Sequence, residues 1–85
     1  MTTITELIQL GNETAVHAAA NVDEIWAEIV TEYQRRGYDT TVRPAAGSWG
    51  DRAITCGLEL KGALADNWAA LPILRDLQAL MTEEA

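Results

Sequence analysis

Three glutamates at a regular spacing are the side chains in this sequence best suited to binding a partner. Glu24, Glu28 and Glu32 recur every four residues, so a helix would place them on one face about 6 Å apart. That is roughly the spacing of successive phosphates along a nucleic-acid strand. Two interpretations stay open: the carboxylates meet a Lys/Arg-rich protein surface, or they form a solvated face on which Arg35 and Arg36 neutralise Glu32.

Two further residues are candidates for the same surface. Asp23 precedes the row and would add to its negative charge. Trp49 stands in a short stretch bounded by Gly47 and Gly50, and loops of this kind often carry function. An exposed Trp49 would anchor a protein interface. The alternative is that Trp49 folds back and covers one end of the core.

The sequence offers little for catalysis. His17, the only histidine, lies one helical turn after Glu13, and two ligands are too few for a structural metal site. Cys56 falls between Ile54 and Leu58, where a thiol behaves as a small apolar side chain with a raised pKa. Because no nucleophile, base and orienting group occur together, we expect no catalytic, cofactor or metal site and no enzymatic activity.

Composition narrows the class of partner. The chain has 85 residues, a mass of 9.3 kDa, a net charge of −7 and a pI near 4.4. This charge argues against direct binding to nucleic acid and favours a basic protein surface. The length predicts one domain over residues 1–85, and we expect a homodimer because so small a core gains from burying a further face. One cysteine and the lack of a long apolar run predict a cytoplasmic protein that does not enter a membrane.

The apolar residues of the first 36 positions follow a helical period. We predict two helices, over 4–20 and 22–36. The pair Gly11–Asn12 reads as the end of one helix and the start of another, so it permits an additional break. The sequence also leaves open a single helix over 4–36, which would be about 50 Å long.

After Gly37 the period of the apolar residues changes from 3.6 to 2, which predicts strands over 38–43 and 53–61 joined as an antiparallel hairpin. A last helix is predicted over 66–82, either kinked or restarted at Pro72. The predicted fold class is therefore α+β, with helices packed on a two-stranded antiparallel hairpin in the order α-α-β-β-α.

In its small size and acidity the chain resembles phage-encoded or mobile-element inhibitors of host defence, including anti-CRISPR proteins. This resemblance rests on size and charge and carries over no individual residue. It implies a non-enzymatic inhibitor that occupies the nucleic-acid-binding surface of a partner protein. On this hypothesis the contacts come from Asp23, Glu24, Glu28, Glu32 and Trp49. The alternative is a self-assembling structural subunit that pairs through its sheet edge or its helices.

Overall fold

The computed structural model of the protein describes residues 2–84, and within that range the chain is helical and contains no β-strand. The predicted α+β class and its two-stranded hairpin are therefore wrong. Instead, residues 2–84 form five successive helices: α1 (Ile4–Leu10), α2 (Glu13–Ala19), α3 (Val22–Arg35), α4 (Trp49–Asp66) and α5 (Leu71–Thr82).

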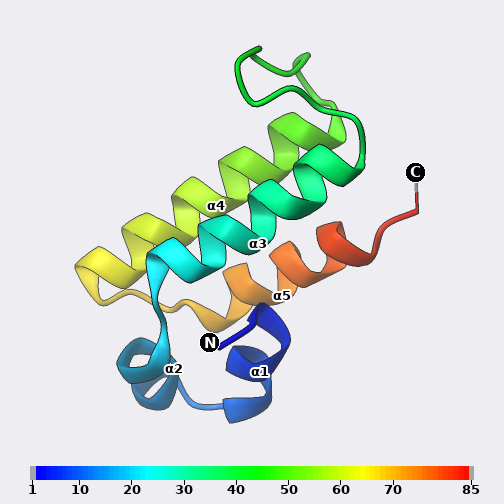
Figure 1. Ribbon diagram of the computed structural model, residues 1–85. Helices are drawn as coiled ribbons and strands as arrows, with labels where there is room; N and C mark the ends of the chain where they lie inside the picture. Colours follow the sequence, from blue (N-terminus) through cyan, green and yellow to red (C-terminus); the bar gives the residue numbers. More distant parts are fainter. Residues whose placement is uncertain (1, 85) are drawn as a thin grey trace.

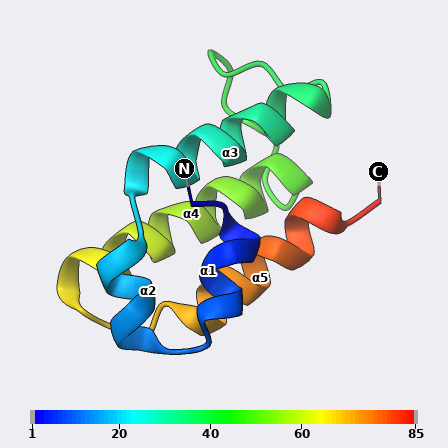
Figure 2. The same cartoon turned by 60° about the horizontal axis from the view of Figure 1, so that its bottom comes forward.

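Helices α3 and α4 lie side by side as one layer (Figure 1). Helix α5 packs against the other side of α4, α1 packs against α5, and α2 contacts α1. Figure 2 shows α1 lying against α5, with α3 and α4 behind them. The connection over 37–48 extends beyond one end of the α3–α4 layer, whereas the short α4–α5 connection lies at the other end (Figures 1 and 2).

The core is filled by aliphatic side chains from all five helices, each of which contributes at least one that is almost fully buried. These side chains are Ile4, Leu7, Val16, Ile29, Leu60, Leu74 and Leu77. An aromatic cluster closes the core beneath the 37–48 connection. In it the ring of Tyr38 lies 4.7 Å from that of Tyr33 and 5.9 Å from that of Trp49, measured between centroids, which is normal aromatic packing.

The first predicted helix, over 4–20, is broken at Gly11. This glycine has a φ of +65°, a left-handed conformation that ends α1 and that glycine adopts without steric cost. The Asn12 side chain then caps α2, and the Asn21 side chain caps α3. Residues 4–36 therefore form three helices, because both Asn residues satisfy backbone N–H groups that an unbroken helix would have paired internally.

The predicted strand over 53–61 lies inside α4. Large apolar side chains alternate along this segment, but the buried positions follow the helical spacing of three and four. These positions are Ala53, Cys56, Gly57 and Leu60. Leu58, which the strand would have placed on its inner face, is 56% exposed. The helical period is carried partly by alanine and glycine, so a pattern drawn from bulky residues alone misses it.

Residues 38–43 form a loop and not the predicted strand. Since 53–61 is helical, no neighbouring strand is available to pair with their backbone groups. The carboxylate of Asp39 instead accepts hydrogen bonds from the backbone N–H and the hydroxyl of Thr41, at 2.8 and 2.7 Å. Such turns are typical of aspartate, which offers the backbone a local alternative to a sheet.

The last helix begins at Leu71, next to Pro72, which agrees with the predicted alternative of a restart at this proline. The predicted start at residue 66 is wrong. Helix α4 continues to Asp66, and α5 begins at Leu71 with Pro72 in its first turn. Proline is well suited to this position because its missing N–H would have had no partner within the helix. The residues between the two helices form a short connection.

Candidate functional site

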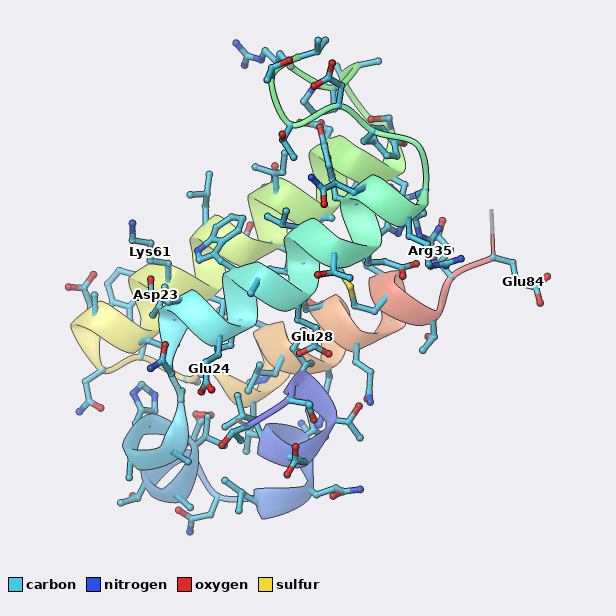
Figure 3. The ribbon with its side chains drawn as sticks, in the orientation of Figure 1. Asp23, Glu24, Glu28, Arg35, Lys61 and Glu84 are labelled. Atoms are coloured by element: carbon cyan, nitrogen blue, oxygen red, sulfur yellow. The ribbon has the colours of Figure 1, made fainter. Side chains whose placement is uncertain are left out.

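The three glutamates of the predicted row line one groove beside α3. Glu24, Glu28 and Glu32 contribute its carboxylates, and the groove encloses about 380 Å³. Figure 3 shows Glu24 and Glu28 directed from α3 toward α1. The remaining lining is small or apolar: Thr3, Ala27, Thr31 and Met81. Such a surface can pack against the aliphatic stem of a lysine or arginine while a carboxylate pairs with its charge.

Glu32 already pairs with two cations of its own chain. Its carboxylate accepts hydrogen bonds at 2.7 Å from Nε of Arg35 and from Nε of Arg36. The hydrogen bonds from Arg35, followed by those from Arg36, lower the pKa of Glu32 to about 2. The solvated-face interpretation therefore describes Glu32 well, because this end of the groove is neutralised internally.

Glu28 has a structural partner as well. Its Oε2 accepts a hydrogen bond of 3.0 Å from the backbone N–H of Ile4, one of the N–H groups at the start of α1 that lack a helical partner. Within residues 2–84, the Glu24 side chain makes no hydrogen bond or ion pair. Glu24 is thus the member of the row whose charge remains available to a binding partner.

The structure does not bring Asp23 and Trp49 into this groove. Asp23 is exposed and lies on the other side of α3 from Glu24 and Glu28 (Figure 3). Trp49 is only 7% exposed, and its Nε1 donates a hydrogen bond of 2.7 Å to the carbonyl oxygen of Leu80. Trp49 therefore covers one end of the core, which is the second of the two alternatives, and it presents no free face to a partner.

His17 and Cys56 also have structural roles. His17 Nε2 lies 2.8 Å from the carbonyl oxygen of Trp68, and it donates in this pair because a carbonyl oxygen can only accept. Cys56 is buried, and that burial raises the pKa of its thiol to about 11, so the nucleophilic thiolate is scarce at neutral pH. Across residues 2–84, no three His, Cys, Asp or Glu side chains are grouped as a metal site requires.

Two apolar surface features are absent from the sequence interpretation. One is a groove of about 330 Å³ between α3, the 37–48 connection and α4. The other is Trp68, which is 65% exposed in the α4–α5 connection. A signal for Trp68 was present in the sequence: Pro72 favours the first turn of a helix, and a helix that starts there leaves residue 68 outside it.

Comparison of the chain with protein-family models, with curated proteins and with solved structures found no match. Among the helices of residues 2–84, none combines the length and the apolar character needed to cross a membrane.

Proposed function

We propose that the protein is a non-enzymatic binding module whose glutamate-lined groove beside α3 engages a Lys/Arg-rich surface of another protein. The observation that carries the proposal is the arrangement of Glu24, Glu28 and Glu32 along one groove whose other lining residues are small or apolar. A net charge of −7 would steer the module toward such a surface from a distance. Where that surface normally binds nucleic acid in the cytoplasm, the module would inhibit its partner by occlusion.

The three glutamates contribute unequally on this proposal. Glu32 is held by Arg35 and Arg36, and Glu28 accepts a hydrogen bond from the start of α1. Glu28 therefore shapes the groove and adds negative charge to it, whereas Glu32 shapes the groove but is neutralised by its two arginines. Glu24 provides the carboxylate that a cation of the partner would pair with, and Met81 provides apolar surface for that cation's aliphatic stem.

The test is a charge reversal at Glu24 compared with one on another surface. Glu59 is a suitable control because it is exposed on α4, and its side chain has no hydrogen bond or ion pair within the described residues. Wild type, E24K and E59K are immobilised and used to capture proteins from a lysate of the source cell. We expect wild type and E59K to retain a protein with an exposed Lys/Arg cluster, and E24K to lose it.

Ionic strength provides a second readout of the same contact. Screening at 1 M salt reduces the Debye length to about 3 Å, so the captured protein should elute from wild type as salt rises. A partner that binds E24K as tightly as wild type, or that is insensitive to salt, would show that this groove is not its binding site. Reversal of Glu28 or Glu32 is a poorer test because it would also remove bonds that stabilise the fold.

A further inference from the structure

The apolar groove between α3 and α4 is a second candidate binding surface, separate from the glutamate-lined groove. It encloses about 330 Å³, and the apolar side chains that line it include Trp26, Val30, Val42, Pro44 and Ile54. Two of these side chains, Val30 and Val42, are exposed. Exposed apolar grooves of this kind commonly mark interaction sites.

The groove has one fixed wall and one charged rim. Trp26 lies directly on the backbone of α4: a Cβ at Gly57 would come within 2.9 Å of its ring, so this close approach depends on glycine. Arg43 borders the groove from the 37–48 connection. The Arg43 side chain has no hydrogen bond or ion pair within residues 2–84, so its charge is available to an incoming carboxylate.

Trp68 is the most exposed large apolar side chain of the chain described here, and its backbone is held on both sides. Its N–H donates to the carbonyl oxygen of Ala63 at 2.9 Å. Its own carbonyl oxygen accepts the hydrogen bond from His17. The indole is therefore presented by a fixed backbone, and its binding would cost less conformational entropy than that of a mobile loop. Asp66, two residues earlier, is exposed and carries a carboxylate without an ion pair in the described residues.

We propose that Trp68 of one copy of the protein inserts into the α3–α4 groove of a second copy, with Asp66 facing Arg43. An exposed indole with a neighbouring carboxylate complements an apolar groove with a neighbouring guanidinium, both in apolar character and in charge. One molecule cannot fill its own groove, since about 18 Å of helix α4 separates Ile54 from Asp66. The contact is therefore between two molecules and joins two different surfaces, and it is independent of the glutamate-lined groove and of the proposed function.

Two variants that each damage one side of this contact provide the test. Trp68→Ala removes the inserted side chain and leaves the groove intact. Val30→Lys places a charge in the groove and leaves Trp68 intact, and both positions are exposed, so the fold should be retained. Sedimentation equilibrium should show wild type associating above its chain mass of 9.3 kDa as its concentration rises to about 1 mM, and each variant associating at least about thirtyfold more weakly.

An equimolar mixture of the two variants distinguishes insertion from a general loss of solubility or fold. The Val30→Lys chain still carries Trp68, and the Trp68→Ala chain still carries the groove. The mixture should therefore form a 1:1 heterodimer, whereas each variant by itself should associate only weakly. Leu10→Ala serves as the matched control: it removes another exposed apolar side chain, far from both features in sequence, and should associate as wild type does.

The charged contact is tested by exchange of its two residues. Arg43→Asp and Asp66→Arg should each weaken association about threefold, and the double variant should recover it. The proposal is overturned if wild type stays monomeric up to about 1 mM, if Trp68→Ala associates as wild type does, or if the mixed variants do not pair.

Discussion

The carboxylate of Glu13 caps helix α5 by accepting a hydrogen bond of 2.6 Å from the backbone N–H of Leu71. The neighbouring N–H of Ala70 donates to the same carboxylate at 2.8 and 2.9 Å. Helix α5 has no side-chain cap of its own, so a residue 58 positions earlier in the chain supplies it. Together with the bond from His17 to Trp68, this contact attaches α2 to the α4–α5 connection.

Glu13→Gln should lower the free energy of unfolding by about 1 kcal/mol, the usual effect of losing a helix N-cap. The amide retains one oxygen acceptor, but it loses the negative charge that the start of a helix favours. Urea denaturation followed by circular dichroism measures the change. Glu59→Gln removes the same charge from an exposed site and should have little effect. Equal destabilisation by the two variants would show that the cap of α5 contributes nothing.

The same contact predicts a pH dependence. The hydrogen bond from Leu71, with a further contribution from Ala70, lowers the pKa of Glu13 below its ordinary value. A carboxylate whose pKa is lower in the folded state stabilises the fold fully above its unfolded pKa, and that stabilisation is lost as pH falls through the folded pKa. The difference in unfolding free energy between wild type and Glu13→Gln should therefore be constant near pH 7 and shrink below about pH 4.5. A difference that grows on acidification would contradict the assignment.

Arg36 and Arg35 share the Glu32 carboxylate but should differ in their contribution to stability. The Arg36 side chain is 7% exposed, against 67% for Arg35. Its guanidinium also lies 4.3 Å from the ring centroid of Trp49 and donates to the backbone carbonyl of Glu83. We expect Arg36→Ala to cost about 2 kcal/mol and Arg35→Ala to have little effect on stability, because its ion pair is exposed to solvent. Urea titrations measure the free energy of unfolding of the two variants. If both variants lost the same free energy, the contacts of Arg36 with the C-terminal end of α5 would not contribute to stability.

Helix α3 was predictable because bulky apolar residues keep a helical period through it, whereas the predicted helix over 4–20 is in fact two helices. The start of a helix at Asn12 was visible as a sequence pattern, and α3 over Val22–Arg35 differs from the predicted range 22–36 by one residue. What the sequence left open was whether the chain turns at Gly11. The Gly11–Asn12 pattern permits a break without requiring one, and the contact by which Glu13 reaches the start of α5 is a long-range one that no local pattern encodes.

The error in α4 has a local cause. Ser48 and Asp51 stand three residues apart, and the Ser48 hydroxyl caps α4 by accepting a hydrogen bond from the N–H of Asp51. This is a recognisable helix start, but Gly47 and Gly50 made the stretch resemble a hairpin loop. Gly50 is in fact buried inside the helix. The burial of Trp49 follows from the same correction, because a residue in the first turn of α4 faces the core whereas a loop residue need not.

Of the predicted partner-binding residues, the glutamate row was the part that spacing could predict. Positions four apart on a helix share a face, and Glu24, Glu28 and Glu32 do line one groove. Spacing could not show that Glu28 would meet the backbone of Ile4, since that contact depends on where the start of α1 lies relative to α3. The internal pairing of Glu32 was foreseen as an alternative because Arg35 and Arg36 are its neighbours on the same helix.

Cys56 should react slowly in the folded protein. Burial raises the pKa of its thiol to about 11, so at pH 8 little thiolate is present, and the side chain is also shielded by its neighbours. A thiol reagent added to the native protein should label Cys56 far more slowly than it labels the urea-unfolded chain. The labelling rate should rise as the pH is increased, because more thiolate forms. Immediate labelling of the native protein at pH 8 would show that Cys56 is not enclosed by α4 and α5.

Two glycines in α4 should respond in opposite directions to alanine. A Cβ at Gly50 would lie 2.7 Å from the Tyr38 ring and 2.9 Å from the Tyr33 ring, whereas a Cβ at Gly62 would have no neighbour within 4 Å. Gly50→Ala must therefore displace packed aromatic rings and should cost about 1–3 kcal/mol. Gly62→Ala should stabilise the protein by about 0.5–1 kcal/mol, because alanine loses less backbone entropy in a helix. Thermal and urea unfolding of both variants give the comparison, and each change adds a single methyl group to the same helix. If Gly50→Ala were instead more stable than wild type, α4 could not approach Tyr33 and Tyr38 this closely.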